Sequence, residues 1–126
     1  MIHLDTSVLI DALTGPRRSA APLRTAIADG ERVAFSSIVL YEWLRGPRLP
    51  QELAAQEALF PRAAAVAFGD EEAALAANLY RKVRRARGRE VDLAVAACAV
   101  THGARLWTLN WRDFADIPGL ELYTLR

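Results

Sequence analysis

The chain begins with MIHLDTSVLIDAL (residues 1–13), in which a short apolar run is followed by an acid and then by a longer apolar run. Residues 2–4 have the composition of a buried β-strand, and residues 6–13 that of an apolar helix. Asp5 therefore falls at the carboxyl end of a strand, where open α/β sheets bind their ligands. An Asp-Thr-Ser sequence is also typical of a helix cap, so this stretch indicates the fold more firmly than a site.

Strands and helices alternate along the rest of the chain. Further strands are expected at 33–35, 65–68, 105–108 and 121–124. Helices are expected at 6–13, 20–29, 37–45, 50–60, 70–86 and 92–102. This alternation predicts an α/β fold with a central, mainly parallel sheet of about five strands, flanked by helices.

The composition favours one domain spanning residues 1–126. With 52% apolar residues, the chain can bury about two-thirds of its unfolded surface. Its longest apolar run, 93–100, is far shorter than the roughly 20 residues that cross a bilayer. Asp5 interrupts the first apolar run before it could act as a secretory signal. We therefore expect a cytoplasmic protein without a membrane partner.

A second acid, Glu42, lies within the expected helix at 37–45. At about 100° per residue, Glu42 projects between Ile38 and Val39, on a side of the helix that should face the core. An ion pair with Arg45 would also explain an acid at this position.

Two more acids lie near the carboxyl-terminal half of the fold. Asp92 opens the expected helix at 92–102, where capping and compensation of the helix dipole explain it as well as a site does. Beyond the strand at 105–108, the chain carries three polar side chains, Thr108, Asn110 and Asp113. A turn would explain Asn110 and a cap would explain Asp113. Acids beside apolar sequence are costly unless they are paired, and a divalent cation is the expected partner.

Four short motifs, taken in order, resemble the PIN domain family and, within it, the VapC-type toxins of bacterial toxin–antitoxin pairs. They are DTS at 5–7, YEWLRG at 41–46, DLAVAACA at 92–99 and TLNWRDF at 108–114. The resemblance covers essentially the whole chain, and its specificity comes from the order and spacing of the motifs.

The resemblance implies a metal-dependent endoribonuclease that hydrolyses RNA with one or two Mg²⁺ or Mn²⁺ ions. By this resemblance, Asp5, Glu42, Asp92 and Asp113 are the catalytic acids and metal ligands. Thr6, Ser7, Thr108 and Asn110 are the supporting polar groups. Many family members have Asp where this chain has Asn110, so the fourth ligand is open between Asn110 and Asp113. The family also implies a cognate antitoxin and a homodimer.

Three other functions are alternatives to a metal-dependent endoribonuclease. A PIN-like module that has lost catalysis and binds RNA or protein is the second hypothesis, because Asn110 replaces an acid. A response-regulator receiver is disfavoured because the chain's one lysine, Lys82, does not end a strand. A haloacid-dehalogenase-type phosphatase is disfavoured because no Asp follows two residues after Asp5.

A basic segment precedes Asp92, although the net charge of the chain is only +1. Residues 81–89 contain six arginines and lysines, which could draw a polyanion towards an acidic site. The candidates for RNA binding are Arg84, Arg85, Arg87 and Arg89. A solvated helix end would explain the same segment.

Three tryptophans, Trp43, Trp107 and Trp111, flank the expected site. A ribonuclease could stack bases on such rings, whereas in most small domains a tryptophan belongs to the core. The sequence leaves both possibilities open.

Overall fold

The computed structural model describes residues 1–125. In chain order its elements are β1 (Ile2–Leu4), α1 (Thr6–Leu13), α2 (Ala20–Ala28), β2 (Val33–Ala34), α3 (Ser37–Arg45), α4 (Pro50–Leu59), η1 (Arg62–Ala64), α5 (Asp70–Lys82), α6 (Glu90–Thr101), β3 (Arg105–Trp107) and η2 (Trp111–Asp113), where η denotes a 3-10 helix.

The sheet has three parallel strands in the order β2-β1-β3. The central strand β1 pairs through Ile2 with Val33 on one side and with Arg105 on the other. Because the strands are parallel, their carboxyl ends meet at one edge, where Asp5 and Thr108 follow β1 and β3 directly. The predicted α/β class with a parallel sheet is thus confirmed.

The expected number of about five strands was too high. Residues 65–68 and 121–124 do run along the two edges of the sheet, but each makes only a single bridge, Val66 with Ser36 and Leu122 with Leu106. The first segment is rich in alanine, which has low β-propensity. It then leaves the sheet at Phe68, whose N–H donates to the Ser37 side chain at 3.0 Å.

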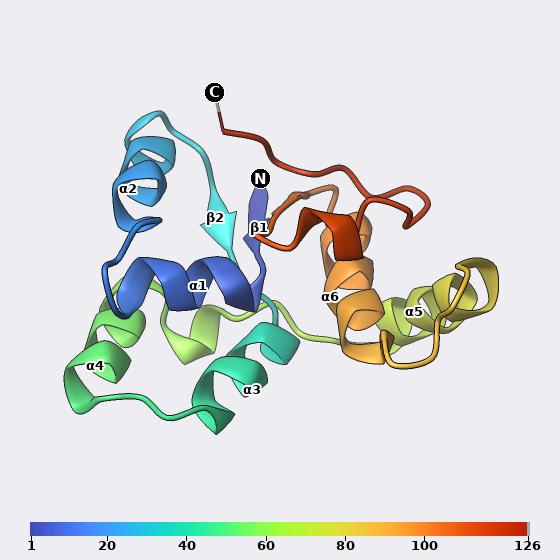
Figure 1. Cartoon of the computed structure of the whole chain (residues 1–126), viewed down its shortest axis with the longest axis horizontal. Coiled ribbons are helices and arrows are strands. Elements are labelled where there is room, and N and C mark those ends of the chain that lie inside the picture. The colour runs from blue at the N-terminus through green and yellow to red at the C-terminus, as the bar shows by residue number, and fades with distance from the viewer. Residues whose placement is uncertain (126) are drawn as a thin grey trace.

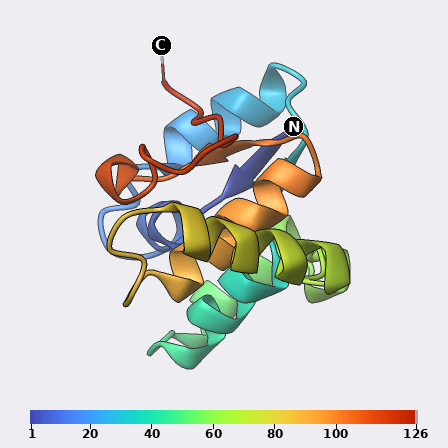
Figure 2. The same cartoon turned by 90° about the vertical axis from the view of Figure 1, so that its right-hand side faces the viewer.

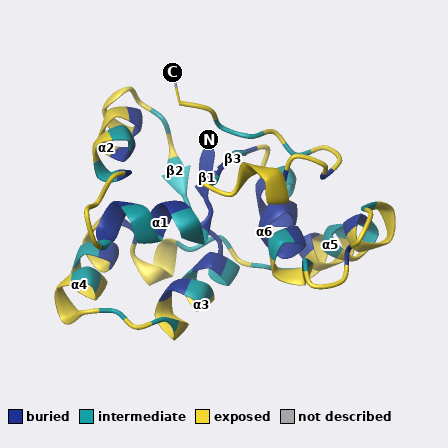
Figure 3. Cartoon of the chain, in the orientation of Figure 1, coloured by how far each residue is buried: buried dark blue, intermediate teal, exposed yellow. Residues whose placement is uncertain are grey.

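Helices cover the sheet from two sides (Figure 1). Helices α1, α2 and α4 lie on one side, α5 and α6 lie on the other, and α3 packs between α1 and α6. Figure 2, seen from the α5 side, shows α5 lying across α6. Helix α6 is buried on every side from Leu93 to Ala99 (Figure 3), as its wholly apolar sequence predicted. No helix within residues 1–125 is long and apolar enough to cross a membrane.

The boundaries of two helices differ from those expected by two residues or more, whereas α2 and α4 each end one residue early. Helix α5 ends at Lys82 and not at residue 86, because Val83 is extended and Arg85 adopts a positive φ of 53°. This turn brings Ala86 into the core, where it is 8% exposed, and that burial outweighs the helical propensity of the arginine-rich segment. Helix α6 begins at Glu90, two residues early, so Asp92 lies within its first turn and not at its start.

Candidate active site at the carboxyl edge of the sheet

Asp5 is the most deeply buried of the four predicted site acids, with only 5% of its surface exposed. Asp5 occupies the N-cap position of α1, but its side chain makes no capping hydrogen bond to the helix. It accepts hydrogen bonds from Ser7 Oγ at 2.8 Å and from Thr108 Oγ1 at 2.7 Å. Both bonds end on Oδ2, which leaves Oδ1 as the oxygen that could bind a ligand.

The hydroxyls of Ser7 and Thr108 are themselves held by backbone amides. The N–H of Leu109 donates to Ser7 Oγ and the N–H of Asn110 donates to Thr108 Oγ1, each at 3.0 Å. Because each hydroxyl has one hydrogen and that hydrogen goes to Asp5, these amides fix the direction in which the hydroxyls donate. The polar residues after β1 and β3 therefore form one network around the Asp5 carboxylate.

Glu42 reaches the same edge from α3. Thr6 Oγ1 donates to its Oε1 at 2.6 Å, and Arg45 Nη2 lies 3.5 Å from its Oε2. Its side chain is 19% exposed, so the expectation that it faces inward is confirmed. The ion pair with Arg45 is present as well, but the arginine side chain is 55% exposed and such pairs contribute little.

Asp92, in the first turn of α6, is electrostatically coupled to the other three acids. The pKa of Asp92 is raised to about 6. The largest cause is partial burial, followed by the charges of Asp5, Asp113 and Glu42, whereas the charge of Arg89 lowers the pKa. The other three predicted acids thus lie close enough to Asp92 for their charges to act on it. Strongly shifted carboxyl pKa values of this kind are typical of functional sites.

The last two predicted residues lie on the exposed segment after β3. Asp113 belongs to η2, and its N–H donates to the carbonyl of Asn110 at 2.9 Å. Both side chains are exposed to solvent. Of the two, Asp113 is the one whose charge reaches Asp92.

The donor set suits a hard cation. Among residues 1–125, no three acid, histidine or cysteine side chains are placed to hold one ion together. Mg²⁺ does not require three, because it commonly keeps several waters and binds one or two carboxylates together with substrate phosphate. Asp5 and Asp92, with Glu42 and Asp113 nearby, supply only oxygen ligands, as Mg²⁺ and Mn²⁺ prefer.

The basic segment contains two kinds of arginine. Arg84, Arg85 and Arg87 are exposed. Arg89 is instead turned inward, where its guanidinium bonds to both carboxylate oxygens of Asp116 at 2.6 and 2.9 Å and to the Asp113 carbonyl at 2.9 Å. It fastens the loop before α6 to the segment after η2. The sequence did not predict the bond between Arg89 and Asp116, because the two residues lie 27 positions apart in the chain.

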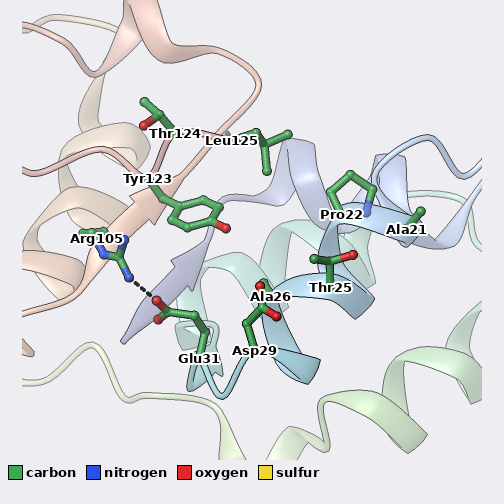
Figure 4. A pocket seen from close by; sticks show the side chains of 10 residues that line it. All are labelled: Ala21, Pro22, Thr25, Ala26, Asp29, Glu31, Arg105, Tyr123, Thr124 and Leu125. Carbon is green, nitrogen blue, oxygen red and sulfur yellow. Dashed lines mark hydrogen bonds and ion pairs between the residues drawn. The ribbon is translucent and has the colours of Figure 1, made fainter.

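A separate cavity of about 630 Å³ lies at the opposite edge of the sheet, where the strands begin (Figure 4). Its wall includes Arg105, which pairs with Glu31 at 2.6 Å and lies over the ring of Tyr123. The main charged group of this cavity is therefore already neutralised, and none of the predicted site residues lines it.

Parallel strands whose carboxyl ends meet near four acids define the chain as an α/β protein with an acidic group of residues at one edge of its sheet. The chain belongs to the PIN domain family, whose model matches residues 2–120. It is 36% identical over 120 residues to Ribonuclease VapC19 of Mycobacterium tuberculosis, a match that covers 94% of this chain and 95% of that protein.

Solved structures of similar fold come from toxin–antitoxin complexes. A chain of the toxin-antitoxin complex from Klebsiella pneumoniae is 27% identical, with a TM-score of 0.73, over 99% of this chain and all of that one. A chain of DNA-bound VapBC from Salmonella typhimurium is 25% identical, with a TM-score of 0.74, over 97% of this chain and 96% of that one. The predicted resemblance to VapC-type PIN proteins is confirmed.

Proposed function

We propose that the chain is a metal-dependent endoribonuclease, the toxin of a toxin–antitoxin pair, which hydrolyses RNA phosphodiester bonds with Mg²⁺ or Mn²⁺. The ribonuclease name of the 36% identical relative supports the reaction. The observation that carries the proposal is the coupling of Asp92 to Asp5, Glu42 and Asp113 at the carboxyl edge of the sheet. Arg45 and Arg89 offset this acidic charge only in part, and a bound cation that neutralises the rest explains the arrangement most simply.

The proposal gives each acid a distinct task. Asp5 binds the ion through Oδ1, since its Oδ2 is committed to Ser7 and Thr108. Asp92 is the second direct ligand, because burial and the charges of the neighbouring acids disfavour its charged form, which an ion would stabilise. Glu42 and Asp113 act from further out, as ligands or through metal-bound water.

A divalent ion at this site would supply an activated water and would offset charge on the phosphate. The chain's own residues position that chemistry. Ser7 and Thr108 hold the Asp5 carboxylate in one orientation, and Thr6 does the same for Glu42. Asn110 contributes its backbone, whose N–H fixes Thr108.

RNA would approach over the loop between α5 and α6. Arg84, Arg85 and Arg87 are exposed there, and this loop leads directly into the helix that carries Asp92. Their charge would attract a polyanion to an acidic site that would otherwise repel it. Arg89 contributes indirectly, by holding the loop in place through Asp116.

The proposed partners follow from the relatives. The similar solved structures are complexes with antitoxins, so we propose a cognate antitoxin that silences this chain, which would itself form a homodimer in the cytoplasm.

The proposal is tested by cleavage of purified cellular RNA by antitoxin-free protein, with Mg²⁺, with Mn²⁺ and with a chelator. Asp5→Asn is the test variant, and Asp29→Asn is the matched control, since Asp29 is exposed at the opposite edge of the sheet. We expect discrete fragments that require metal, persist in Asp29→Asn and vanish in Asp5→Asn. Intact RNA under every condition, from protein shown to be folded, would refute the activity and favour the binding module.

A further inference from the structure

The three tryptophans differ sharply in burial. Trp43 and Trp107 belong to the core, at 0% and 2% exposure, whereas Trp111 is 56% exposed. It lies in the short helix η2, between Asn110 and Asp113 of the proposed site. The core explains the first two rings and leaves the third without a packing role.

The backbone that carries Trp111 is fastened on both sides. Before it, the Asn110 N–H donates to Thr108 Oγ1 at 3.0 Å. After it, the N–H of Phe114 bonds to the Trp111 carbonyl at 3.1 Å, and the Phe114 ring is 1% exposed. An exposed aromatic ring on a fixed backbone loses little conformational entropy when it binds.

Two hollows meet at the Trp111 ring. One, of about 320 Å³, has a mainly apolar wall that includes Trp107, Leu109, Leu122 and Tyr123. It also reaches Thr108, which bonds to Asp5. The other hollow, of about 330 Å³, is lined by residues 109–113, and so includes Asn110 and Asp113. Trp111 and Leu109 line both hollows, so Trp111 stands between an apolar recess and the hollow that includes Asp113.

We propose that Trp111 stacks against an unpaired base of the RNA next to the bond that is cleaved, with the base in the apolar recess. This inference rests on the proposed function and adds a residue that positions the substrate at the proposed site. Thr108 lines this recess and donates a hydrogen bond to Asp5 of the proposed site. The Arg112 guanidinium lies over one face of the Trp111 ring, 5.3 Å from its centre, so a base would stack on the other face with positive charge nearby.

The expected effect is substantial. Loss of one base-stacking ring lowers affinity by roughly 5-fold to 150-fold, and the effect depends little on which base is stacked. Because Trp111 is exposed and outside the core, its replacement should leave folding intact.

The test measures binding of a short single-stranded RNA to protein that carries Asp5→Asn, so that the RNA stays intact. Trp111→Ala and Trp111→Phe are compared with Tyr80→Ala, a control aromatic that is 41% exposed on α5 and lines a different pocket. Intrinsic fluorescence gives a second readout, because the other two tryptophans are buried. A series of RNAs with the base removed at successive positions identifies the base that stacks.

We expect Trp111→Ala to weaken binding about 10-fold, Trp111→Phe to restore most of it, and Tyr80→Ala to have no effect. Removal of one particular base should weaken binding to the parent protein and cause no further loss in Trp111→Ala. Equal RNA affinity of Trp111→Ala and of its parent would overturn the inference. If the proposed function is wrong and the inference on Trp111 is right, RNA will quench the fluorescence of Trp111, but the wild-type protein will not cleave that RNA.

Discussion

Replacement of Asp92 by Asn should stabilise the metal-free protein at neutral pH. The pKa of Asp92 is raised from 3.8 to about 6 by burial and by Asp5, Asp113 and Glu42. About two pKa units correspond to about 3 kcal/mol at 1.36 kcal/mol per unit. Because the side chain is only half-buried, solvent screening reduces this to about 1–2 kcal/mol.

The sign of the effect depends on pH. A carboxyl group whose pKa is higher in the folded than in the unfolded state binds more protons when folded, so stability falls as pH rises from about 4 to about 6. Above pH 6 the folded protein carries the full cost of the Asp92 charge, and below pH 4 it carries none. Asp92→Asn should therefore raise the melting temperature by roughly 3–8 °C at pH 7.5, and the gain should vanish near pH 4.

Thermal melts followed by circular dichroism, in chelator and between pH 4 and 8, measure this difference. Asp29→Asn is the control, and its stability should follow that of the wild type at every pH. Added Mg²⁺ should stabilise the wild type and leave Asp92→Asn unchanged, since only the former would bind the ion well. A stability difference between Asp92→Asn and the wild type that does not change with pH would refute the reasoning.

Three further predictions concern the groups around the site and the core. Thr108→Val removes a hydrogen-bond donor to Asp5 and the acceptor for the Asn110 N–H. RNA cleavage should therefore slow at least 10-fold, while the free energy of unfolding changes by no more than about 2 kcal/mol. Equal cleavage rates of the variant and the wild type would contradict this prediction. The double variant Arg84→Ala, Arg85→Ala should bind RNA more weakly, and its slope of log affinity against log salt should be smaller by about 1.4. RNA titrations at several salt concentrations measure this slope. An unchanged slope would exclude these arginines from the interface. Burial and the charges of His102 and the amino terminus lower the pKa of His3 to about 4. Because the unfolded chain then binds a proton more readily than the folded one, the free energy of unfolding should decrease as pH falls from about 6.5 to about 4. A His3 nuclear magnetic resonance signal that titrates near 6.5 would contradict this prediction.

Local signals predicted the elements that frame the site. Helices α1 and α3 have the predicted limits, and α3 begins at a serine cap, with the Val39 N–H donating to Ser36 Oγ at 3.2 Å. Mainly apolar runs likewise identified β1, which contains His3, and the buried helix α6. In each case neighbouring residues carry the whole signal.

Distant contacts decided what the sequence could not. Helix α5 ends where it does because Ala86 is buried and Arg89 bonds to Asp116, and neither contact is visible in the helical pattern of residues 81–86. The choice between a cap and a site for Asp5 depends on Thr108, which lies 103 residues away. The three tryptophans flank the site alike in sequence, and only the packing separates Trp111 from the two core rings.

The central claim is that the acids at the carboxyl edge of the sheet bind a divalent ion, and Mn²⁺ binding tests it most directly. Paramagnetic resonance measures free Mn²⁺ during titration of the wild type, Asp5→Asn and Asp29→Asn, without any assumption about the RNA. The account predicts saturable binding to the wild type and to Asp29→Asn, and its loss in Asp5→Asn. Equal Mn²⁺ binding by all three proteins, each shown to be folded, would contradict it.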